Sequence, residues 1–271
     1  MTSVLELSGA GVEYGRGRRR GSGTVALRDA DLIIERGERV ALVGRSGAGK
    51  STIARMAVGL VLPTSGSVTV LGQDLATLSS SDLRRLRRRM QIVFQDPYQS
   101  LHPGLRVEQI VGEPLSIAGI RRRERRSRVV EALEVLGLRP SDQFINRYPS
   151  SLSGGQRQRV ALARTLVAGP ELILADEPAS MLDASLRASI AEHLLAVRDT
   201  LDATLVFVTH DLALARHVAD RIVVLADGFI VEDGPTEQII AAPAHQETMS
   251  LLDAARTLEN YIRPEQGSLK P

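Results

Sequence analysis

Residues Gly44 to Ser51 read G-R-S-G-A-G-K-S, and this stretch decides the fold. It matches the pattern G-x-x-x-x-G-K-[ST], a loop whose backbone N–H groups surround the phosphates of a nucleoside triphosphate. Residues 39–43 before it are apolar enough for a buried strand, and residues 52–57 after it contain no helix breaker. Strand, loop and helix therefore follow in the order that the motif requires. The sequence predicts an α/β protein with a phosphate loop (P-loop) that binds a nucleotide.

The residues of this loop have separate expected roles. The N-terminus of the following helix supplies unpaired N–H donors and the positive end of a dipole. Lys50 is expected to reach the β- and γ-phosphates, and the Ser51 hydroxyl to bind Mg²⁺. The alternative, a glycine-rich turn without a ligand, is disfavoured by the flanking strand and helix. The predicted phosphate-binding residues are Gly44, Arg45, Ser46, Gly47, Ala48, Gly49, Lys50, Ser51 and Thr52.

The composition narrows the class of protein. The 271 residues are 43% hydrophobic and 24% charged, which suits one large globular domain or two small ones. The absence of cysteine excludes disulfides, thiolate metal sites and iron–sulfur clusters. No apolar run approaches the roughly 20 residues of a membrane-spanning helix, and residues 2–11 do not read as a secretory signal. We therefore expect a cytoplasmic protein.

The arginines are clustered, although the net charge is only +2. The clusters lie at residues 16–20, 84–89 and 121–128. Such runs are typical either of a nucleic-acid or anionic-lipid surface or of an ordinary solvated face. No aromatic residue lies between these arginines, and aromatic residues make up 3% of the chain, so stacking on bases is not favoured. We expect solvated surface and no nucleic-acid partner.

Two kinds of strand are expected. Alternating residues before position 40 predict antiparallel strands. The continuous apolar runs at residues 171–176 and 204–209 predict parallel strands that are covered on both faces. Residues 184–201 between them read as the connecting helix of a βαβ unit. The sequence thus predicts a mainly parallel core together with an antiparallel β part.

Two further segments complete the expected fold. Asp227-Gly228, flanked by apolar runs, predicts a hairpin. From about residue 107 to residue 138 the pattern is helical and rich in arginine, glutamate and leucine, with expected breaks at Pro114 and Gly119. This shift in composition predicts a separate helical part.

An acidic pair completes the expected nucleotide site. Asp176 ends the apolar run 171–176, where its carboxylate can hold Mg²⁺ through water. Glu177 follows at the carboxyl edge of the sheet, where it can polarise an attacking water as a general base. The alternative is that the acidic pair merely caps the next turn. The order of loop, strand and acids favours catalysis.

Another motif selects the class of ATPase. Residues 152–159 read L-S-G-G-Q-R-Q-R, and with the features above the chain resembles the ATP-binding cassette (ABC) ATPases over roughly residues 3–240. This resemblance implies a RecA-like core at residues 1–240, a helical subdomain inserted at about 96–160, and a short C-terminal extension at 241–271. It also implies that the signature motif acts on the ATP of a partner. The signature residues are Leu152, Ser153, Gly154, Gly155 and Gln156.

The resemblance implies four further roles. Gln95 is similar to the family's glutamine that joins the core to the helical subdomain and contacts the metal, beside Ser51 and, through water, Asp176. Asp183 lies where the family has its dimer-contact loop. His210 resembles the switch histidine that senses the γ-phosphate, and Tyr14 lies where an aromatic ring stacks on adenine.

The implied mechanism needs two chains. In ABC ATPases each ATP, with its Mg²⁺, lies between one phosphate loop and the signature of the partner. Because this chain carries one set of motifs, the resemblance implies a dimer with an identical or similar ATPase.

The chain also resembles one subgroup, the ATPases of dipeptide, oligopeptide and nickel importers. Residues 94–103 read F-Q-D-P-Y-Q-S-L-H-P, and residues 243–248 partly match the subgroup's P-x-H-P-Y-T, differing at Gln246 and Glu247. This implies two membrane permeases that dock near Tyr98 to Leu105, an external solute-binding protein that acts indirectly, and a peripheral location on the cytoplasmic face of the inner membrane. The alternatives are an ABC ATPase that acts on nucleic acid or the ribosome, or one in a soluble metabolic complex.

Overall fold

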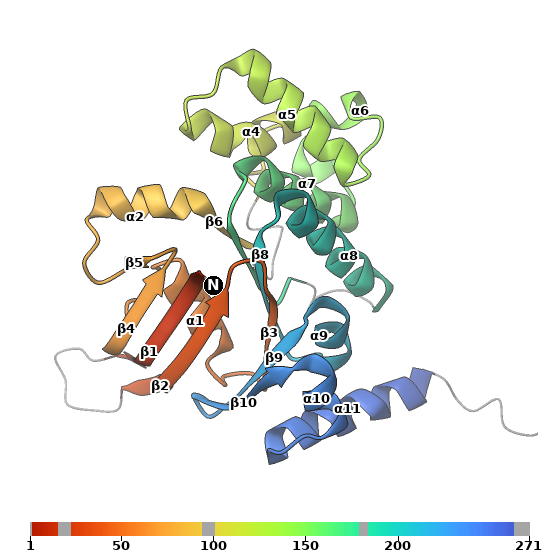
Figure 1. The fold of residues 1–271 in the computed structure, drawn as a ribbon. Coiled ribbons are helices and arrows are strands. Elements are labelled where there is room, and N and C mark those ends of the chain that lie inside the picture. The colour runs from red at the N-terminus through yellow and green to blue at the C-terminus, as the bar shows by residue number, and fades with distance from the viewer. Residues whose placement is uncertain (1, 16–22, 94–100, 179–183, 263–271) are drawn as a thin grey trace, which may run out of the picture.

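The computed structural model describes residues 2–15, 23–93, 101–178 and 184–262, and two sheets organise it (Figure 1). One sheet has six strands in the order β10-β9-β3-β8-β7-β6, and the other has four in the order β2-β1-β4-β5. The strands are β1 (Ser3–Tyr14), β2 (Thr24–Glu35), β3 (Arg39–Val43), β4 (Ser65–Val70), β5 (Gln73–Asp74), β6 (Met90–Val93), β7 (Leu172–Asp176), β8 (Thr204–Thr209), β9 (Arg221–Ala226) and β10 (Phe229–Pro235).

Helices surround these sheets. In Figure 1 the group α4 to α6 stands at the top, and α9 to α11 lie at the bottom. The helices are α1 (Lys50–Ala57), α2 (Ser80–Leu86), α4 (Val107–Ile117), α5 (Arg122–Val135), α6 (Asp142–Ile145), α7 (Gly154–Ala168), α8 (Ala184–Leu201), α9 (Leu212–Val218), α10 (Thr236–Ala241) and α11 (Gln246–Ile262), with 3-10 turns η1 (Arg87–Arg89) and η2 (Pro149–Ser151).

The six-stranded sheet is the core, and its inner strands β9, β3, β8 and β7 are buried on both faces. Parallel pairing joins β9, β3, β8, β7 and β6, whereas β10 pairs antiparallel with β9 at the edge. Every residue of β7 and β8 is buried, as their continuous apolar runs predict. Val40 and Leu42 share an apolar cluster with Ile53 of α1, while Phe207 packs in another with residues of α7 and α8. The predicted parallel core and its helical cover are confirmed.

The four-stranded sheet is antiparallel, which confirms the second predicted part. Buried and exposed residues alternate along the second half of β2, from Ala30 to Ile34. This alternation is typical of a sheet with one face on the core and one in water.

The helical part differs from prediction at one point. Pro114 does not break the helix but lies inside α4, which continues to Ile117, and the expected break at Gly119 is present with a φ of 78°. Proline removes one N–H donor and usually costs a few kcal/mol in a helix interior. Val107, Ile110 and Val111 of α4 are buried in the cluster that includes α5 and α7, and this tertiary packing outweighs the local preference.

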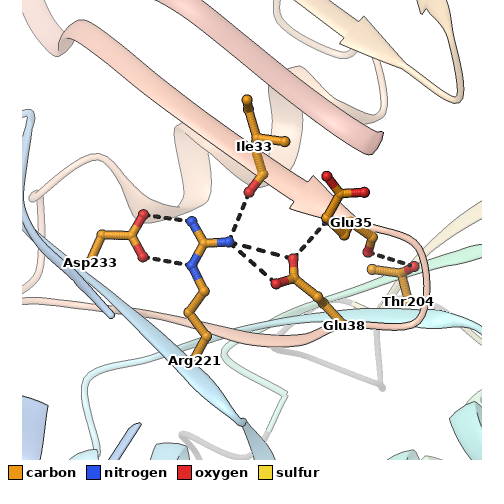
Figure 2. A network of polar contacts seen from close by, with 6 residues as sticks. All are labelled: Ile33, Glu35, Glu38, Thr204, Arg221 and Asp233. Atoms are coloured by element: carbon orange, nitrogen blue, oxygen red, sulfur yellow. Dashed lines mark hydrogen bonds and ion pairs between the residues drawn. The ribbon is translucent and has the colours of Figure 1, made fainter. Parts of the chain in front are cut away.

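A polar network joins the two sheets beside the strand that leads to the phosphate loop (Figure 2). Arg221 of β9 donates to both carboxylate oxygens of Asp233, at 2.6 Å each, and to the Ile33 carbonyl at 2.9 Å. The same guanidinium meets Glu38, whose carboxylate accepts from the Glu35 backbone N–H at 2.7 Å. Charge-assisted hydrogen bonds therefore fix the turn between β2 and β3 against β9 and β10.

The C-terminal helices pack on the edge of the core. Ile239 of α10 and Leu252 of α11 share an apolar cluster with Ala41 and Val43 of β3 and with residues of α9. Because this cluster includes residues of β3, residues near the C-terminus lie beside the strand that precedes the phosphate loop.

Candidate nucleotide site

The phosphate loop requires glycines for its shape. Gly44, Gly47 and Gly49 have φ values of 152°, 84° and 105°, in the region that L side chains rarely adopt. A Cβ at Gly44 would lie 2.2 Å from the Leu225 carbonyl oxygen, so this position also needs glycine for space. The loop therefore turns tightly from β3 into α1.

Lys50 begins α1, and its side chain folds over the loop. Its Nζ donates to the carbonyl oxygens of Gly44 and Arg45, at 2.7 and 2.8 Å. The lysine is 4% exposed, and burial lowers the pKa of its ammonium group. The carboxylates of Glu177, Asp176 and Glu247 act on that pKa in the opposite direction. A buried cation thus lies at the centre of the loop with three carboxylates near it.

Ser51 and Asp176 meet although 125 residues separate them in the sequence. The Ser51 hydroxyl donates to Asp176 Oδ1 at 2.7 Å, which joins the start of α1 to the end of β7. A hydroxyl and a carboxylate are the hard oxygen donors that Mg²⁺ prefers in nucleotide sites. The donor set on these two elements therefore fits the metal that the sequence implies.

Glu177 follows β7 in an unusual backbone conformation. Its φ is 48°, in the left-handed region that disfavours residues other than glycine, and its N–H donates to the Val208 carbonyl at 3.0 Å. The carboxylate is largely buried, and its Oε2 lies 3.6 Å from Nδ1 of the half-exposed His210. The structure thus brings together Asp176, Glu177 and His210 at the carboxyl ends of β7 and β8.

The signature motif forms the start of α7. The N–H of Gln156 donates to the Ser153 hydroxyl at 3.3 Å, and the Ser153 N–H donates to Gln156 Oε1 at 3.0 Å. This reciprocal capping box fixes the helix end, while Ser153 itself is exposed and Leu152 is buried. No hydrogen bond or ion pair joins residues 152–156 to residues 44–52 within the described part of the chain.

The structure describes Tyr14, whereas some other predicted residues lie outside the described ranges. Tyr14 ends β1, pairs in register with Thr24 and is 39% exposed. Gln95 and Asp183 lie outside the described ranges, as do Tyr98 and the two residues after it, and of the expected permease-docking stretch the structure describes residues 101–105.

Two contacts near the site were not predicted from the sequence. Gln158 of α7 is 2% exposed, and its Nε2 donates to the Pro178 carbonyl at 2.7 Å, which ties the signature helix to the residue after Glu177. Glu247 of α11 forms an ion pair with Arg45 of the phosphate loop at 3.3 Å. The only signal for the second contact was the departure from the subgroup pattern at Gln246 and Glu247.

The fold and these groups define a P-loop nucleotide-binding protein with the architecture of an ATP-binding cassette. The family model described as ABC transporter matches residues 27–180. A putative peptide import ATP-binding protein of Brucella ovis is 41% identical over 270 residues, which cover 99% of this chain and 84% of that protein. A probable peptide ABC transporter ATP-binding protein of Sinorhizobium fredii is 43% identical, over 85% of this chain and 65% of that protein. The chain belongs to the ABC transporter ATPase family.

Solved structures agree with this assignment. The ATP-binding cassette MJ0796, in a dimeric post-hydrolysis state bound to ADP and Pi, matches with a TM-score of 0.75 and 34% identity. The match covers 86% of this chain and 98% of that one. The cbiO1 protein of Clostridium perfringens, part of the ABC transporter complex cbiONQ, matches with a TM-score of 0.78 and 26% identity over 98% and 100% of the two chains. Among the described residues, no helix is long and apolar enough to cross a membrane.

Proposed function

We propose that this chain is the ATP-hydrolysing subunit of a peptide importer. The observation that carries the ATPase part is the convergence of Lys50, the Ser51–Asp176 pair and Glu177 where β3 and β7 end. The peptide part is supported by the names of two relatives, a peptide import and a peptide transporter ATP-binding protein, which match 99% and 85% of the chain.

The residues of the site have distinct proposed roles. Lys50 exchanges its two carbonyl contacts for oxygens of the β- and γ-phosphates, joined by the N–H groups of the loop. Ser51 and, through water, Asp176 hold Mg²⁺ with Gln95, and the metal when bound neutralises developing phosphate charge. Glu177 takes a proton from the water that attacks the γ-phosphorus, and ADP leaves with the β–γ bridging oxygen. His210, beside Glu177, senses the γ-phosphate.

Completion of the site is proposed to need a second ABC ATPase, identical or similar. The capping box holds the signature with Ser153 exposed, so that the partner's ATP can meet Ser153, Gly155 and the helix N-terminus. Asp183 then contacts the partner, and Tyr14 stacks on adenine. ATP bridges the two chains, and hydrolysis removes the bridge.

The proposed domain organisation follows from these roles. The core at residues 1–240 binds nucleotide, the helical subdomain inserted at about 96–160 carries the signature, and residues 241–271 form an extension. Two permeases dock near Tyr98 to Leu105, which places the ATPase on the cytoplasmic face of the inner membrane. An external solute-binding protein delivers the peptide to the permeases.

The test is an affinity purification of the tagged protein from gently solubilised native membranes, with co-purifying chains identified by mass spectrometry. We expect two multi-spanning permeases, with or without a second ATPase. The matched control is the same purification from the soluble fraction. Recovery of ribosomes, nucleic acid or a soluble enzyme complex in place of permeases would contradict the transport proposal and leave the ATPase assignment intact.

A further inference from the structure

The first turn of α11 lies against the phosphate loop. Glu247 Oε1 is 3.3 Å from Arg45 Nε, and these residues are separated by 202 positions in the sequence (247 − 45). The two side chains differ in environment, since that of Glu247 is 14% exposed and that of Arg45 is 68% exposed. Among the described residues, Oε1 of Glu247 is buried and accepts no hydrogen bond, so its charge is balanced by the Arg45 ion pair and by the nearby ammonium group of Lys50. The loop thus has an acidic neighbour that comes from outside the ATPase motifs.

The chain holds this neighbour in place. Glu232 of β10 accepts hydrogen bonds from the Ala244 N–H and from the Thr248 hydroxyl, on either side of Glu247. Thr248 is fully buried, and the Glu247 N–H donates to His245 Nδ1 at 3.1 Å. The start of α11 is therefore fixed on β10, and this docking holds the backbone of Glu247 beside the loop.

The charge of Glu247 opposes the charge of the ligand. Phosphate groups are anions, and a carboxylate near their site weakens their binding by Coulomb repulsion. Asp176 is engaged by Ser51, and Glu177 lies beside His210, but Glu247 contacts the loop itself at Arg45. The carbonyl of Arg45 accepts from Lys50 while its guanidinium meets Glu247, so the residue is held from both sides.

We propose that Glu247 sets the nucleotide affinity of the phosphate loop: carried by the docked helix α11, it restrains the Arg45 side chain and weakens binding of the nucleotide phosphates. This inference rests on the proposed nucleotide function of the same site. It makes Glu247 a positioning residue, because it acts through Arg45 and not on the reacting atoms. It also links the C-terminal extension to the loop, since undocking α11 would remove the carboxylate.

The test is calorimetric titration of the full chain with MgADP, which avoids hydrolysis and ATP-driven dimerisation. Glu247→Gln keeps the shape of the side chain and removes its charge. We expect MgADP to bind about three- to tenfold more tightly at low salt, and the gain to shrink toward about twofold at 1 M salt because the repulsion is screened. A purely structural role predicts the opposite sign, since a displaced loop binds more weakly. Unchanged or weaker binding overturns the proposal, as does a gain that salt does not reduce.

Three variants separate the parts of the proposal. The matched control is Glu237→Gln, which neutralises a carboxylate of α10 that pairs with Arg216 at 2.9 Å, and we expect no change in affinity. In an Arg45→Gln background, Glu247→Gln should lose at least half of its gain, because no guanidinium is released toward the phosphates. Glu232→Gln should tighten binding about twofold by loosening α11. An equal gain in Glu237→Gln would overturn the local charge effect of Glu247. An undiminished gain without Arg45 would overturn the action through Arg45, and no effect of Glu232→Gln would overturn the role of α11 docking.

Failure of the inference is distinguishable from failure of the proposed function. If the unmodified chain binds no MgADP, the nucleotide site itself is wrong. If it binds MgADP and Glu247→Gln does not tighten that binding, the site stands and the role of Glu247 is refuted.

Discussion

The phosphate loop and the signature motif are built in opposite ways. Around the loop, Lys50 is buried and donates to the carbonyl oxygens of Gly44 and Arg45, and Ser51 already meets the carboxylate of Asp176. At the signature, Ser153 is exposed and its hydrogen bonds go to Gln156 in the same helix end. The loop region is tied across the fold through Ser51 and Asp176, whereas the Ser153 hydroxyl is bonded within its own helix end. The difference teaches that the phosphate loop is anchored inside the fold, whereas the signature serine faces outward, as a site shared between two chains would require.

The polar contacts around the two regions differ in the same way, because those near the loop join distant segments and the pair on α5 is local. Near the loop, Arg221 contacts the Ile33 carbonyl of β2, Glu38 in the turn after β2, and Asp233 of β10. The Arg221 side chain is 25% exposed. On α5, in the helical part, Arg128 pairs with Glu124 four residues earlier, and both side chains are about half exposed. The partly buried contacts of Arg221 are therefore expected to stabilise the loop region more than the half-exposed pair on α5 stabilises the helical part.

The largest effect should follow from removal of the buried cation. Lys50→Ala leaves the loop without its charge for the phosphates, and we expect MgADP affinity to fall by about 100-fold or more. Isothermal titration measures this loss. Arg55→Ala, which removes an exposed cation from the same helix, is the matched control and should bind normally. If Lys50→Ala bound MgADP with ordinary affinity, the assignment of this loop as the phosphate-binding part of the site would be wrong.

Glu177→Gln should affect turnover and spare binding. Without a general base, ATP hydrolysis is expected to fall by about 100-fold or more, while ATP still binds and holds two chains together. Phosphate release measures the rate, and light scattering with Mg-ATP measures the dimer. If Glu177→Gln stayed monomeric with Mg-ATP, both the general-base role of Glu177 and the two-chain site would be contradicted.

Ser153→Arg tests the outward-facing half directly. We expect ATP hydrolysis to fall about 10- to 100-fold, because the partner's γ-phosphate loses its donors, while MgADP affinity of the single chain stays within about twofold. Mixing this variant with Lys50→Ala gives the decisive comparison. A mixed dimer contains one intact loop facing one intact signature, so partial recovery of activity is expected. No recovery would mean that the two halves do not meet between chains.

Arg221→Gln should cost stability near the loop. Loss of the charge-assisted hydrogen bonds to Asp233 and the Ile33 carbonyl is expected to lower the free energy of unfolding by about 1–3 kcal/mol. Urea denaturation measures the change. Arg128→Gln, at the exposed pair on α5, should cost less than about 0.5 kcal/mol. If Arg221→Gln and Arg128→Gln lowered the free energy of unfolding equally, the expected difference in stability between the loop region and the helical part would be contradicted.

The smallest effect concerns pH. The hydrogen bond from Arg89 holds the pKa of Glu171 below its ordinary value, with a further contribution from Arg36. A lowered folded-state pKa adds stability above the unfolded pKa, near about 4.3, and this contribution is lost as pH falls through the folded value. We expect Glu171→Gln to cost less than about 1 kcal/mol at pH 7 and to cost less still at about pH 3, below the unfolded pKa. Urea denaturation at both pH values measures the difference, and a cost that is unchanged at the lower pH would assign it to packing.

The core could be predicted from the sequence because its signals are local. The bounds expected for β3, β8 and α8 match the structure. These elements were predictable because the pattern of apolar residues along a strand or helix reflects which of its faces are buried. The phosphate-loop geometry also followed from a motif whose glycines fix the backbone. These predictions required no knowledge of which distant segments meet.

The missed features depend on contacts between distant segments. Pro114 was wrongly expected to end a helix, because its local preference is visible and the packing of α4 is not. The Gln158 contact with Pro178 and the Glu247 contact with Arg45 join residues that no sequence spacing relates. The short elements α2 and β5 carry too few residues for a clear period.

At position 177 the backbone and the proposed chemistry favour different amino acids. Glycine, asparagine and aspartate adopt a φ of 48° more readily than glutamate does. A library varied at this position and selected only for resistance to proteolysis should therefore become enriched in those residues. The same library selected for growth on an imported peptide should return glutamate. The position thus separates the amino acid that suits the fold from the one that suits turnover.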